Sequence, residues 1–346
     1  MSVRLFIPQN YKPLLNPRDT EPAIRAIKEF FQTNLAFELN LTRVTAPLFV
    51  KGGTGINDDL NSVEKPAWFT AEGLRGTRLE MVQSLAKWKR LTLAELGFEP
   101  GEGLYTDMNA IRPSETLDNT HSLYVDQWDW ERVIAREERN VGFLKWIVRR
   151  IYDVIRRTER YVCFHYPVIE PVLPDEITFL HSEDLQRQYP ELAPPQRETE
   201  ACREHGAVFV RGIGAPLADG EPHDGRAPDY DDWVSLGDDQ RKGLNGDIIV
   251  HNPLLDSAFE LSSMGIRVDA ESLLQQLAIR QCEEWKELYF HTRLLAGELP
   301  LSIGGGIGQS RLCMFYLRKA HIGEIQASVW PDDMSDHCRQ NNIFLL

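Results

Sequence analysis

The sequence predicts an α+β fold in which an antiparallel β-sheet is flanked by helices. Two largely apolar segments, at 246–253 and 259–268, follow each other closely and are expected to pair as antiparallel strands. Along the chain we expect a helix, then strands, then helices at about 133–206, then further strands and a last helix. Internal repeats and low-complexity linkers are absent from the sequence. We therefore expect an N-terminal arm at 1–18 and a single domain at 19–346, with the helices as an insertion.

The composition is that of an acidic protein with enough apolar residues for a substantial core. The chain has 346 residues, of which 42% are hydrophobic and 26% are charged, and its formal net charge is −14. Proteins bind nucleic acid largely because Lys and Arg neutralise phosphates, so this charge argues against a general affinity for nucleic acid. It leaves room for a local basic pocket that binds a small anion.

The distribution of cysteines and apolar residues bears on where the protein is found. Five cysteines are dispersed without a Cys-x-x-Cys pair, which favours reduced thiols of an intracellular protein over disulfides or a zinc site. The N-terminus contains several prolines and does not resemble a signal peptide. An uncharged stretch of about 18 residues or more, which a membrane span needs, is absent from the sequence. We expect a cytoplasmic protein.

The first expected element is an amphipathic helix at about 21–36. Asp19 and Thr20 offer a cap, and apolar residues recur at helical spacing. A strand at 41–50 follows and is interrupted by Pro47, which is tolerated at a sheet edge or at an interface. A long helix followed by such a strand is one candidate for a dimer-forming element.

Two polar features follow this first strand. The glycine-rich turn at 52–55 and the acids after it are either the tip of a hairpin or a flexible loop that carries Asp58 over a site. After a strand at 78–83 we expect a helix at 85–96, with Lys89 in its first half, where a cation opposes the helix dipole. The cations of this helix are therefore either a solvated face or retained to bind an anion.

The segment 101–132 predicts two strands joined by a loop. The first strand ends at Arg112, and in the second strand alternation places Leu123, Gln127 and Asp129 on the same side. Polar side chains on one face of two joined strands suit a sheet that holds a polar ligand. The alternative is an edge strand with one face in water.

The middle of the chain is predicted to be mainly helical. We expect a long helix at 133–162, a strand at 177–181, two short helices of which the second spans 196–205, and a buried strand at 207–210. These helices are the ones that we expect as an insertion in the domain.

The charged loop at 219–233 contains Arg226 and Asp231. Disorder is one interpretation, but two aromatic residues in the loop favour an ordered lid or a loop that binds metal and phosphate. The two strands after it carry Asp247 and Glu260. Two carboxylates on neighbouring strands can share Mg²⁺, which prefers oxygen ligands.

A capped helix at about 269–294 precedes a stretch with four glycines at 304–308. We expect a strand-to-helix turn there, because glycine lets a backbone approach a ligand closely and the next helix would direct its N–H groups at that ligand. Arg311 lies early in this helix and can bind phosphate or carboxylate in a fork. The glycine spacing fits neither the dinucleotide fingerprint nor a Walker loop, which leaves a nucleotide site of another kind or a tight turn.

The candidate site residues are mostly arginines and acids, and no arrangement typical of a Ser or Cys nucleophile stands out. They are the cations Arg112, Arg226, Arg311 and Lys89, the acids Asp247 and Glu260, and the polar group Asp58, Gln127 and Asp129. Such a set suits phosphate chemistry that proceeds by positioning and electrostatics.

Several segments, in the same order along most of the chain, resemble one enzyme family. They include Tyr-Val-Asp-Gln-Trp-Asp-Trp-Glu-Arg at 124–132 and Ile-Gly-Gly-Gly-Ile-Gly-Gln-Ser-Arg-Leu at 303–312, and the others are at 84–90, 101–106, 226–233, 243–248 and 259–269. In these segments the sequence strongly resembles the ammonia-dependent asparagine synthetases, the aspartate–ammonia ligases of the A type. The first 50 residues and the tail after Pro331 match poorly.

That family is similar to the catalytic core of class II aminoacyl-tRNA synthetases of the aspartyl and asparaginyl kind. The resemblance implies an antiparallel sheet flanked by helices. It also implies a homodimer, with the first helix and the strand at Pro47 as the dimer-forming motif.

The resemblance implies a two-step reaction. ATP and aspartate give β-aspartyl-adenylate and pyrophosphate, and ammonia then attacks the activated carbonyl to give asparagine and AMP. Arg112 is implied to hold the α-phosphate and the attacking carboxylate together, while Arg226 and Arg311 hold the outer phosphates or the adenylate. Asp247 and Glu260 are implied to carry Mg²⁺.

The resemblance also implies the residues that contact each ligand. Lys89 is expected to pair with a ligand carboxylate, and Asp58 is the best candidate to attract ammonium or to accept its proton. The catalytic set is Arg112, Asp58, Lys89 and Arg311. The aspartate-binding set is Asp58, Lys89, Arg112, Gln127, Asp129, Ser263 and Arg311. The ATP-binding set is Arg112, Leu123, Arg226, Asp231, Asp247, Glu260, Gly306 and Arg311.

Three other functions fit the sequence less well than this one. A tRNA synthetase would need an anticodon module and a basic face, and the chain has no spare domain. A glutamine-dependent synthetase would need a Cys after the initiator Met, where this sequence has Ser2. A non-catalytic amino-acid-binding or regulatory relative would be expected to have lost some of the arginines or the acid pair, and these are all present.

Overall fold

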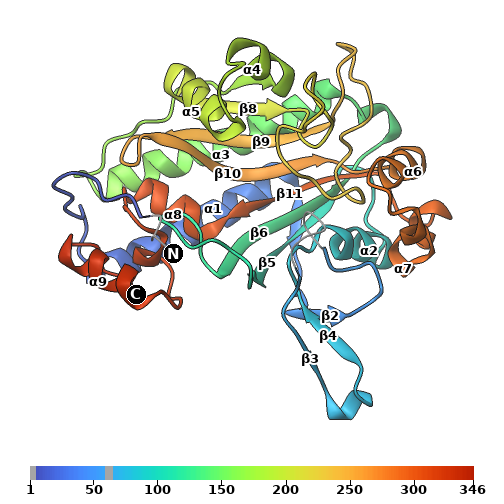
Figure 1. The fold of residues 1–346 in the computed structure, drawn as a ribbon, viewed down its shortest axis with the longest axis horizontal. Coiled ribbons are helices and arrows are strands. Elements are labelled where there is room, and N and C mark those ends of the chain that lie inside the picture. Colours follow the sequence, from blue (N-terminus) through green and yellow to red (C-terminus); the bar gives the residue numbers. More distant parts are fainter. Residues whose placement is uncertain (1–4, 59–64) are drawn as a thin grey trace.

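The computed structural model describes residues 5–58 and 65–346, which are built around one large sheet (Figure 1). The sheet has eight strands in the order β1-β5-β6-β11-β10-β9-β8-β7. The strands are β1 (Leu41–Arg43), β5 (Gly103–Ile111), β6 (Tyr124–Val133), β7 (Thr178–His181), β8 (Ala207–Arg211), β9 (Asn245–Asn252), β10 (Ser257–Ile266) and β11 (Ser302–Gly308). The two outermost pairs are parallel and the pairs between them are antiparallel. The predicted α+β class and antiparallel sheet are confirmed.

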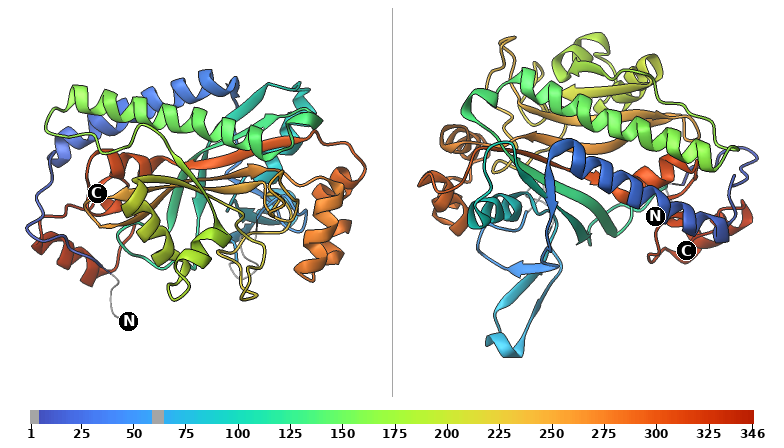
Figure 2. Two further views of the ribbon diagram at one scale, coloured as in Figure 1. Left: turned by 90° about the horizontal axis from the view of Figure 1, so that it is seen from above. Right: turned by 180° about the vertical axis from the view of Figure 1, so that it is seen from behind.

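One face of the sheet is covered by α1 (Pro17–Leu39), α3 (Val141–His165) and α8 (Gln309–Tyr316) (Figure 2). The largest hydrophobic core lies between these helices and the sheet. In it the ring of Phe31 lies 4.6 Å from the ring of Trp128, centroid to centroid, and both side chains are fully buried. Burying a side chain such as Phe31 contributes about 1.5–3 kcal/mol, so this face accounts for much of the stability.

The period-two alternation of β6 decides what the other face carries. Trp128 and Trp130 point into the core under α1, so Gln127 and Asp129 point to the opposite face. The helix α2 (Ala86–Leu96) packs on β6 at this second face. Further along the sheet, α4 (Ser182–Gln188) and α5 (Pro194–His205) cover β8 and β9.

A second, three-stranded sheet projects away from the body as an arm (Figure 1). It contains β2 (Phe49–Lys51), β4 (Arg78–Met81) and β3 (Trp68–Thr70) in that order, with the short helix η1 (Glu72–Leu74) between β3 and β4. Several of its large apolar side chains are exposed, among them Trp68.

The remaining helices lie near the ends of the sheet and in the C-terminal part of the chain. They are η2 (Arg136–Glu138), α6 (Ala270–Ile279), η3 (Glu283–Glu287), α7 (Tyr289–Leu295), η4 (Ile322–Glu324) and α9 (Asp332–Gln340). Tyr11, in the N-terminal segment, packs with Met334 and Cys338 of α9. The predicted division into an N-terminal arm at 1–18 and a single domain at 19–346 stays a prediction. Among residues 5–58 and 65–346, no helix has both the length and the apolar character needed to cross a membrane.

Two predicted helices begin elsewhere than expected. The first begins at Pro17 because Asn16 is the cap, its Oδ1 accepting from the backbone N of Asp19 at 3.0 Å. The long helix begins at Val141 because β6 continues to Val133 and Asn140 supplies the cap. In both cases an asparagine marks the start more accurately than the apolar pattern does.

Two other predicted elements are divided in the structure. The strand predicted at 41–50 is split around Pro47 into β1 and β2, which belong to different sheets. The helix predicted at 269–294 is broken into α6, η3 and α7. The break follows from Gln281, whose φ of 56° is left-handed and cannot continue a right-handed helix.

Candidate active site

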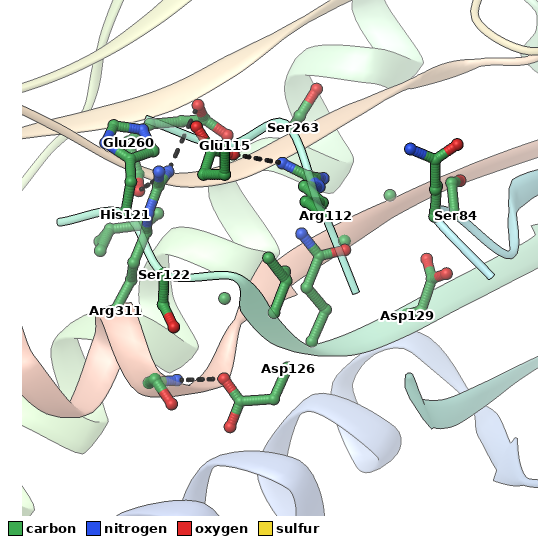
Figure 3. A pocket seen from close by; sticks show the side chains of 18 of the residues that line it. Ser84, Arg112, Glu115, His121, Ser122, Asp126, Asp129, Glu260, Ser263 and Arg311 are labelled. Carbon is green, nitrogen blue, oxygen red and sulfur yellow. Dashed lines mark hydrogen bonds and ion pairs between the residues drawn. The ribbon is translucent and has the colours of Figure 1, made fainter. Parts of the chain in front are cut away.

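A cavity of about 390 Å³ opens on the face of the large sheet opposite α1 and α3. Its walls come from the β5–β6 loop, from β6, β10 and β11, from the start of α8 and from the loop at 224–231. Most of the predicted site residues line it, and Figure 3 shows several of them. They are Arg112, Gln127, Asp129, Arg226, Asp231, Glu260, Ser263, Gly306 and Arg311. Asp58, Lys89, Leu123 and Asp247 lie outside its lining.

The glycine-rich stretch is a strand, β11, which leads directly into α8, and so it is not the tight turn that the sequence suggested. Gly304 and Gly306 are required because side chains of β6 cross over them. A Cβ on Gly304 would lie 2.0 Å from Oε2 of Glu131, and a Cβ on Gly306 would lie 2.3 Å from Oε1 of Gln127. Gly304 and Gly306 do not have the positive φ that favours glycine, so close approach alone explains them.

Arg112 and Arg311 reach the cavity from two different segments (Figure 3). Arg112 follows β5, and its Nη1 lies 3.8 Å from Oε2 of Glu115, while its buried Nε has no hydrogen-bond partner among the described residues. Its backbone N donates to the carbonyl oxygen of Leu123 at 2.8 Å, so Leu123 lies next to this wall without lining it. Arg311, in the first turn of α8, has Nη1 3.6 Å from Oε2 of Glu260. Guanidinium groups held in this way can bind the phosphates or the carboxylate of a ligand.

His121 is a cavity residue that the sequence analysis missed. Its Nδ1 lies 2.9 Å and 3.0 Å from the two carboxylate oxygens of Asp118, which fixes the ring. Burial raises the pKa of the Asp118 carboxyl, but the hydrogen bonds from His121 and Thr120 hold the net pKa down at about 2. His121 lies in the loop between two strands that both carry site residues. That position could have identified it from the sequence.

The acids Asp247 and Glu260 lie on neighbouring strands, as predicted. Glu260 lines the cavity, whereas Asp247 is buried behind it and accepts a hydrogen bond from Nη2 of Arg226. Arg226 also donates from Nη1 to Asp224 at 2.7 Å. Burial raises the pKa of the Asp247 carboxyl to about 7, with a further rise from Glu260 and an opposing effect of Arg226.

The donor set at this end of the cavity fits a magnesium ion that is shared with a phosphate ligand. Oδ1 of Asp247 is buried and has no hydrogen-bond partner among the described residues, and Glu260 next to it is partly exposed. Residues 5–58 and 65–346 contain no group of three or more His, Cys, Asp or Glu that could hold a metal alone. Two carboxylates with phosphate oxygens and water are a common environment of Mg²⁺ in enzymes that bind nucleotides.

Lys89 lies beneath the cavity floor and does not reach the cavity. Its side chain is fully buried, and Nζ pairs with the carboxylate of Asp129 and donates to the carbonyl oxygen of Trp130 at 2.7 Å. The partner of Lys89 in this structure is therefore a protein carboxylate that itself lines the cavity.

Arg267 and Glu131 extend this buried network, and the sequence analysis missed both. Arg267 lines the cavity and contacts Glu131 through two nitrogens, while its Nη1 pairs with Asp231. Burial raises the pKa of Glu131, but Arg267 and Lys89 produce a net lowering, so the carboxylate is charged. Glu131 follows Gln127 and Asp129 in the alternation of β6, and that spacing could have identified it.

Asp58 is buried at the end of a described segment, outside the cavity lining. Its backbone N donates at 3.1 Å to Oδ1 of Asn57, which also accepts from the backbone N of Gln83 at 3.0 Å. Burial is the main cause that raises the pKa of Tyr230, and Asp58 raises it further. Since Tyr230 lines the cavity and Asp58 acts on its pKa, Asp58 lies near that part of the wall.

Comparison with known proteins identifies close relatives over nearly the whole chain. The model of a family described as aspartate-ammonia ligase matches residues 18–342. The chain is 58% identical over 343 residues to an aspartate–ammonia ligase of Clostridium perfringens and 60% identical over 342 residues to one of Bacteroides fragilis. In both cases the match covers 99% of each chain.

Comparison with solved structures shows a shared fold at low sequence identity. The asparaginyl-tRNA synthetase of Pyrococcus horikoshii, solved with asparaginyl-adenylate, matches 90% of this chain and 70% of its own, with a TM-score of 0.66 and 14% identity. The asparaginyl-tRNA synthetase of Entamoeba histolytica matches with a TM-score of 0.63 and 13% identity, over 90% of this chain and 67% of its own. The chain therefore has the fold of a class II synthetase core.

Proposed function

The chain belongs to the aspartate–ammonia ligase family, and we propose that the cavity on the open face of its sheet is where the family's reaction takes place. The enzyme makes L-asparagine from L-aspartate, ammonia and ATP through a β-aspartyl-adenylate, and it releases AMP and pyrophosphate. The observation that carries the assignment of the site is that Arg112 and Arg311 line the same cavity with Glu260.

In the first step, an oxygen of the β-carboxylate of aspartate attacks the α-phosphorus of ATP, and the bond to pyrophosphate breaks. Arg112 holds the attacking carboxylate and the α-phosphate next to each other, since its unpartnered Nε can donate to either of them. Holding two reactants in this way lowers the entropic part of the barrier. Arg226 and Arg311 bind the outer phosphates or the adenylate, and Asp231 and the backbone at Leu123 complete the nucleotide site.

Asp247 and Glu260 would hold Mg²⁺ in this proposal, and when bound it would supply positive charge against that of the leaving pyrophosphate. The buried, unpaired Oδ1 of Asp247 supports this role, because such an oxygen is costly unless it gains a partner.

The aspartate substrate is bound at the end of the cavity formed by Gln127, Asp129 and Ser263. Because Gly306 has no side chain, the side chain of Gln127 has room next to it. We propose that Lys89 acts through Asp129: the ion pair orients that carboxylate, so that Asp129 can accept from the α-ammonium of aspartate.

In the second step, the nitrogen of ammonia attacks the activated carbonyl carbon, the bond from that carbon to the adenylate oxygen breaks, and AMP leaves. Ammonium must lose one proton before it can attack, and the nitrogen loses a second proton on becoming an amide. We propose that Asp58 attracts ammonium and accepts the first proton, because it is a buried acid near Tyr230 of the cavity wall, and that the second proton passes to water.

We propose a cytoplasmic homodimer that binds neither nucleic acid nor membranes. The dimer would form through α1 and the segment from β1 to β2. The strand β1 is at the edge of the large sheet, and Leu48 is 49% exposed beside Pro47. Phe37 of α1 is 85% exposed, which adds apolar surface next to this edge.

Product analysis tests the function directly. Protein is incubated with ATP, Mg²⁺ and aspartate, with ammonium in one tube and glutamine in another. We expect asparagine and AMP, and not ADP, in the ammonium tube. If folded protein gives no asparagine in either tube, the amino-acid-binding or regulatory relative without catalysis becomes the better interpretation.

A further inference from the structure

Three buried charged or polar side chains meet behind the cavity, outside the site described above. They are Lys87 of α2, Asp229 of the loop before β9, and His291 of α7. Nζ of Lys87 lies 2.6 Å from Oδ2 of Asp229, and Nε2 of His291 lies 3.0 Å from the same oxygen. Because an ionised carboxylate can only accept, Nε2 of His291 carries the hydrogen.

Burying these three side chains lowers the stability of the fold, which indicates that the cluster has a role beyond filling space. All three side chains are at most 3% exposed, and burying such charges is often no better for stability than burying apolar residues. In addition, Oδ1 of Asp229 and Nδ1 of His291 are buried without hydrogen-bond partners among the described residues.

Each member of the cluster is tied to a segment that serves the proposed site. Lys87 follows Ala86, and Asp229 precedes Tyr230, and both of these neighbours line the cavity. His291 is tied to the segment that leads to Asp58. A Cβ on Gly55 would lie 2.9 Å from Nδ1 of His291, so the backbone of Gly55 packs directly against the imidazole ring.

The backbone of the same segment is also attached to the start of α7. The backbone N of Phe290 donates to the carbonyl oxygen of Thr54 at 3.3 Å. Gly55 has a φ of 71°, a conformation that residues other than glycine adopt only with strain. Three residues further on, the chain reaches Asp58.

We propose that His291 is a positioning residue for the ammonia step: anchored by Asp229 and Lys87, its ring sets the position of the Gly55 backbone and thereby of Asp58. The inference rests on the role proposed above for Asp58. It separates the two half-reactions, because Arg112 and Arg311, which are assigned to adenylation, are held by contacts with Glu115, Leu123 and Glu260 and not by this cluster. Loss of the anchor therefore impairs the transfer of ammonia more than the formation of the adenylate.

The test compares the two half-reactions in matched variants. Aspartate-dependent exchange of pyrophosphate into ATP, without ammonium, reports the first step, and asparagine formation against ammonium concentration reports both. The variants are Gly55→Ala, which presses on the ring, and His291→Leu, which removes the bond to Asp229. Gly53→Ala is the control, because Gly53 has a φ of 75° but no atom within 4 Å of an added Cβ, so it carries the strain without the contact.

We expect Gly55→Ala and His291→Leu to lower asparagine formation at limiting ammonium by about 10- to 100-fold, and to change exchange by about twofold or less. Gly53→Ala should leave both activities within about twofold of wild type. His291→Gln, whose side-chain amide can still donate to Asp229, should recover most of the loss seen in His291→Leu.

The inference is overturned if exchange and asparagine formation fall together in folded Gly55→Ala, or if neither changes. It is also overturned if Gly53→Ala behaves like Gly55→Ala, since backbone strain alone would then be the cause. Should His291→Leu fail to fold, the pair of glycine variants decides. If the wild type itself shows neither exchange nor asparagine formation, the proposed function fails, which is a different result from failure of this inference.

Discussion

Lys89 and Asp129 form a buried ion pair beneath the floor of the cavity, with the Lys89 side chain fully buried and that of Asp129 only 6% exposed. A second carboxylate, Glu131, has Oε2 at 3.5 Å from the same ammonium group. The charge of Lys89 therefore offsets the negative charges of two acids, of which Asp129 lines the cavity. If Asp129 binds the substrate as proposed, substrate recognition and folding depend on the same residue.

Replacing Lys89 by Met keeps the volume and removes the charge. We expect a loss of about 3–5 kcal/mol in the free energy of unfolding, because one partner of a buried pair is left uncompensated. Urea unfolding followed by tryptophan fluorescence measures it. As a control, Lys28→Met removes a lysine whose side chain is 31% exposed and pairs with Asp126, and it should cost less because water can partly solvate the pair. Equal losses in the two variants would contradict the account of Lys89.

Gly304→Ala should destabilise the protein although the residue lies in ordinary strand conformation. The added Cβ would lie 2.0 Å from Oε2 of Glu131, which is fully buried and held by Arg267 and Ser302. Overpacking of this kind costs about 1–3 kcal/mol, and more where the neighbour cannot move. Gly73→Ala, which meets no atom within 4 Å, is the control. Thermal unfolding of both variants checks this, and an unchanged Tm for Gly304→Ala would contradict it.

The sequence predicts much of this site from local patterns. Arg112 ends a predicted strand, Gln127 is placed by strand alternation, Glu260 is an acid of a predicted strand pair, and Arg311 follows the glycine-rich stretch. All four line the cavity. The sequence could not show that Lys89 lies beneath the cavity lining and pairs with Asp129. That depends on Asp129, which lies 40 residues further along the chain, and pairing across such a separation has no local signal.

The sequence alone also could not show why positions 304 and 306 are glycine. Glycine in a turn and glycine in a strand under a crossing side chain look alike in a single sequence. Only the pairing of β11 with β6, which sets Gly304 opposite Glu131 and Gly306 opposite Asp129, shows that space is what these positions need. In the same way, the sequence does not reveal the left-handed conformation of Gln281 that breaks the predicted helix.

Asp247→Asn should abolish adenylation while the protein stays folded. The change removes the charge that the proposed magnesium site requires but keeps the shape of the side chain. We expect aspartate-dependent pyrophosphate exchange to fall by about 100-fold or more, as for other charges that act on a transferring phosphate. Asp256→Asn, at the turn between β9 and β10, removes an exposed acid of the same hairpin and should leave exchange unchanged. Normal exchange in Asp247→Asn would remove this residue from the site.

His321 should make the stability depend on pH in the acid range. Burial lowers its pKa to about 4, from about 6.5 in the unfolded chain. Because the folded pKa is the lower one, protons bind preferentially to the unfolded chain. This contribution to stability is fully present above about pH 6.5 and is lost as the pH falls towards 4. The shift corresponds to about 3 kcal/mol.

His321→Asn isolates this effect. The Asn side chain can still accept from the backbone N of Gly323, as Nδ1 of His321 does at 3.0 Å, but it does not titrate. We expect the difference in the free energy of unfolding between wild type and variant to change by about 3 kcal/mol between pH 7 and pH 4. Parallel pH profiles for the two proteins would show that His321 does not titrate between the folded and unfolded states in this range.

The most direct test of the account is to measure aspartate-dependent pyrophosphate exchange in the complete absence of ammonium, in the wild type and in Arg112→Ala. The account predicts exchange in the wild type, because the adenylate forms in this cavity before ammonia takes part. It predicts a loss of about 100-fold or more in Arg112→Ala, since the carboxylate and the α-phosphate are no longer held together. Exchange that requires ammonium, or exchange that survives in folded Arg112→Ala, would contradict the assignment of this cavity as the site of adenylation.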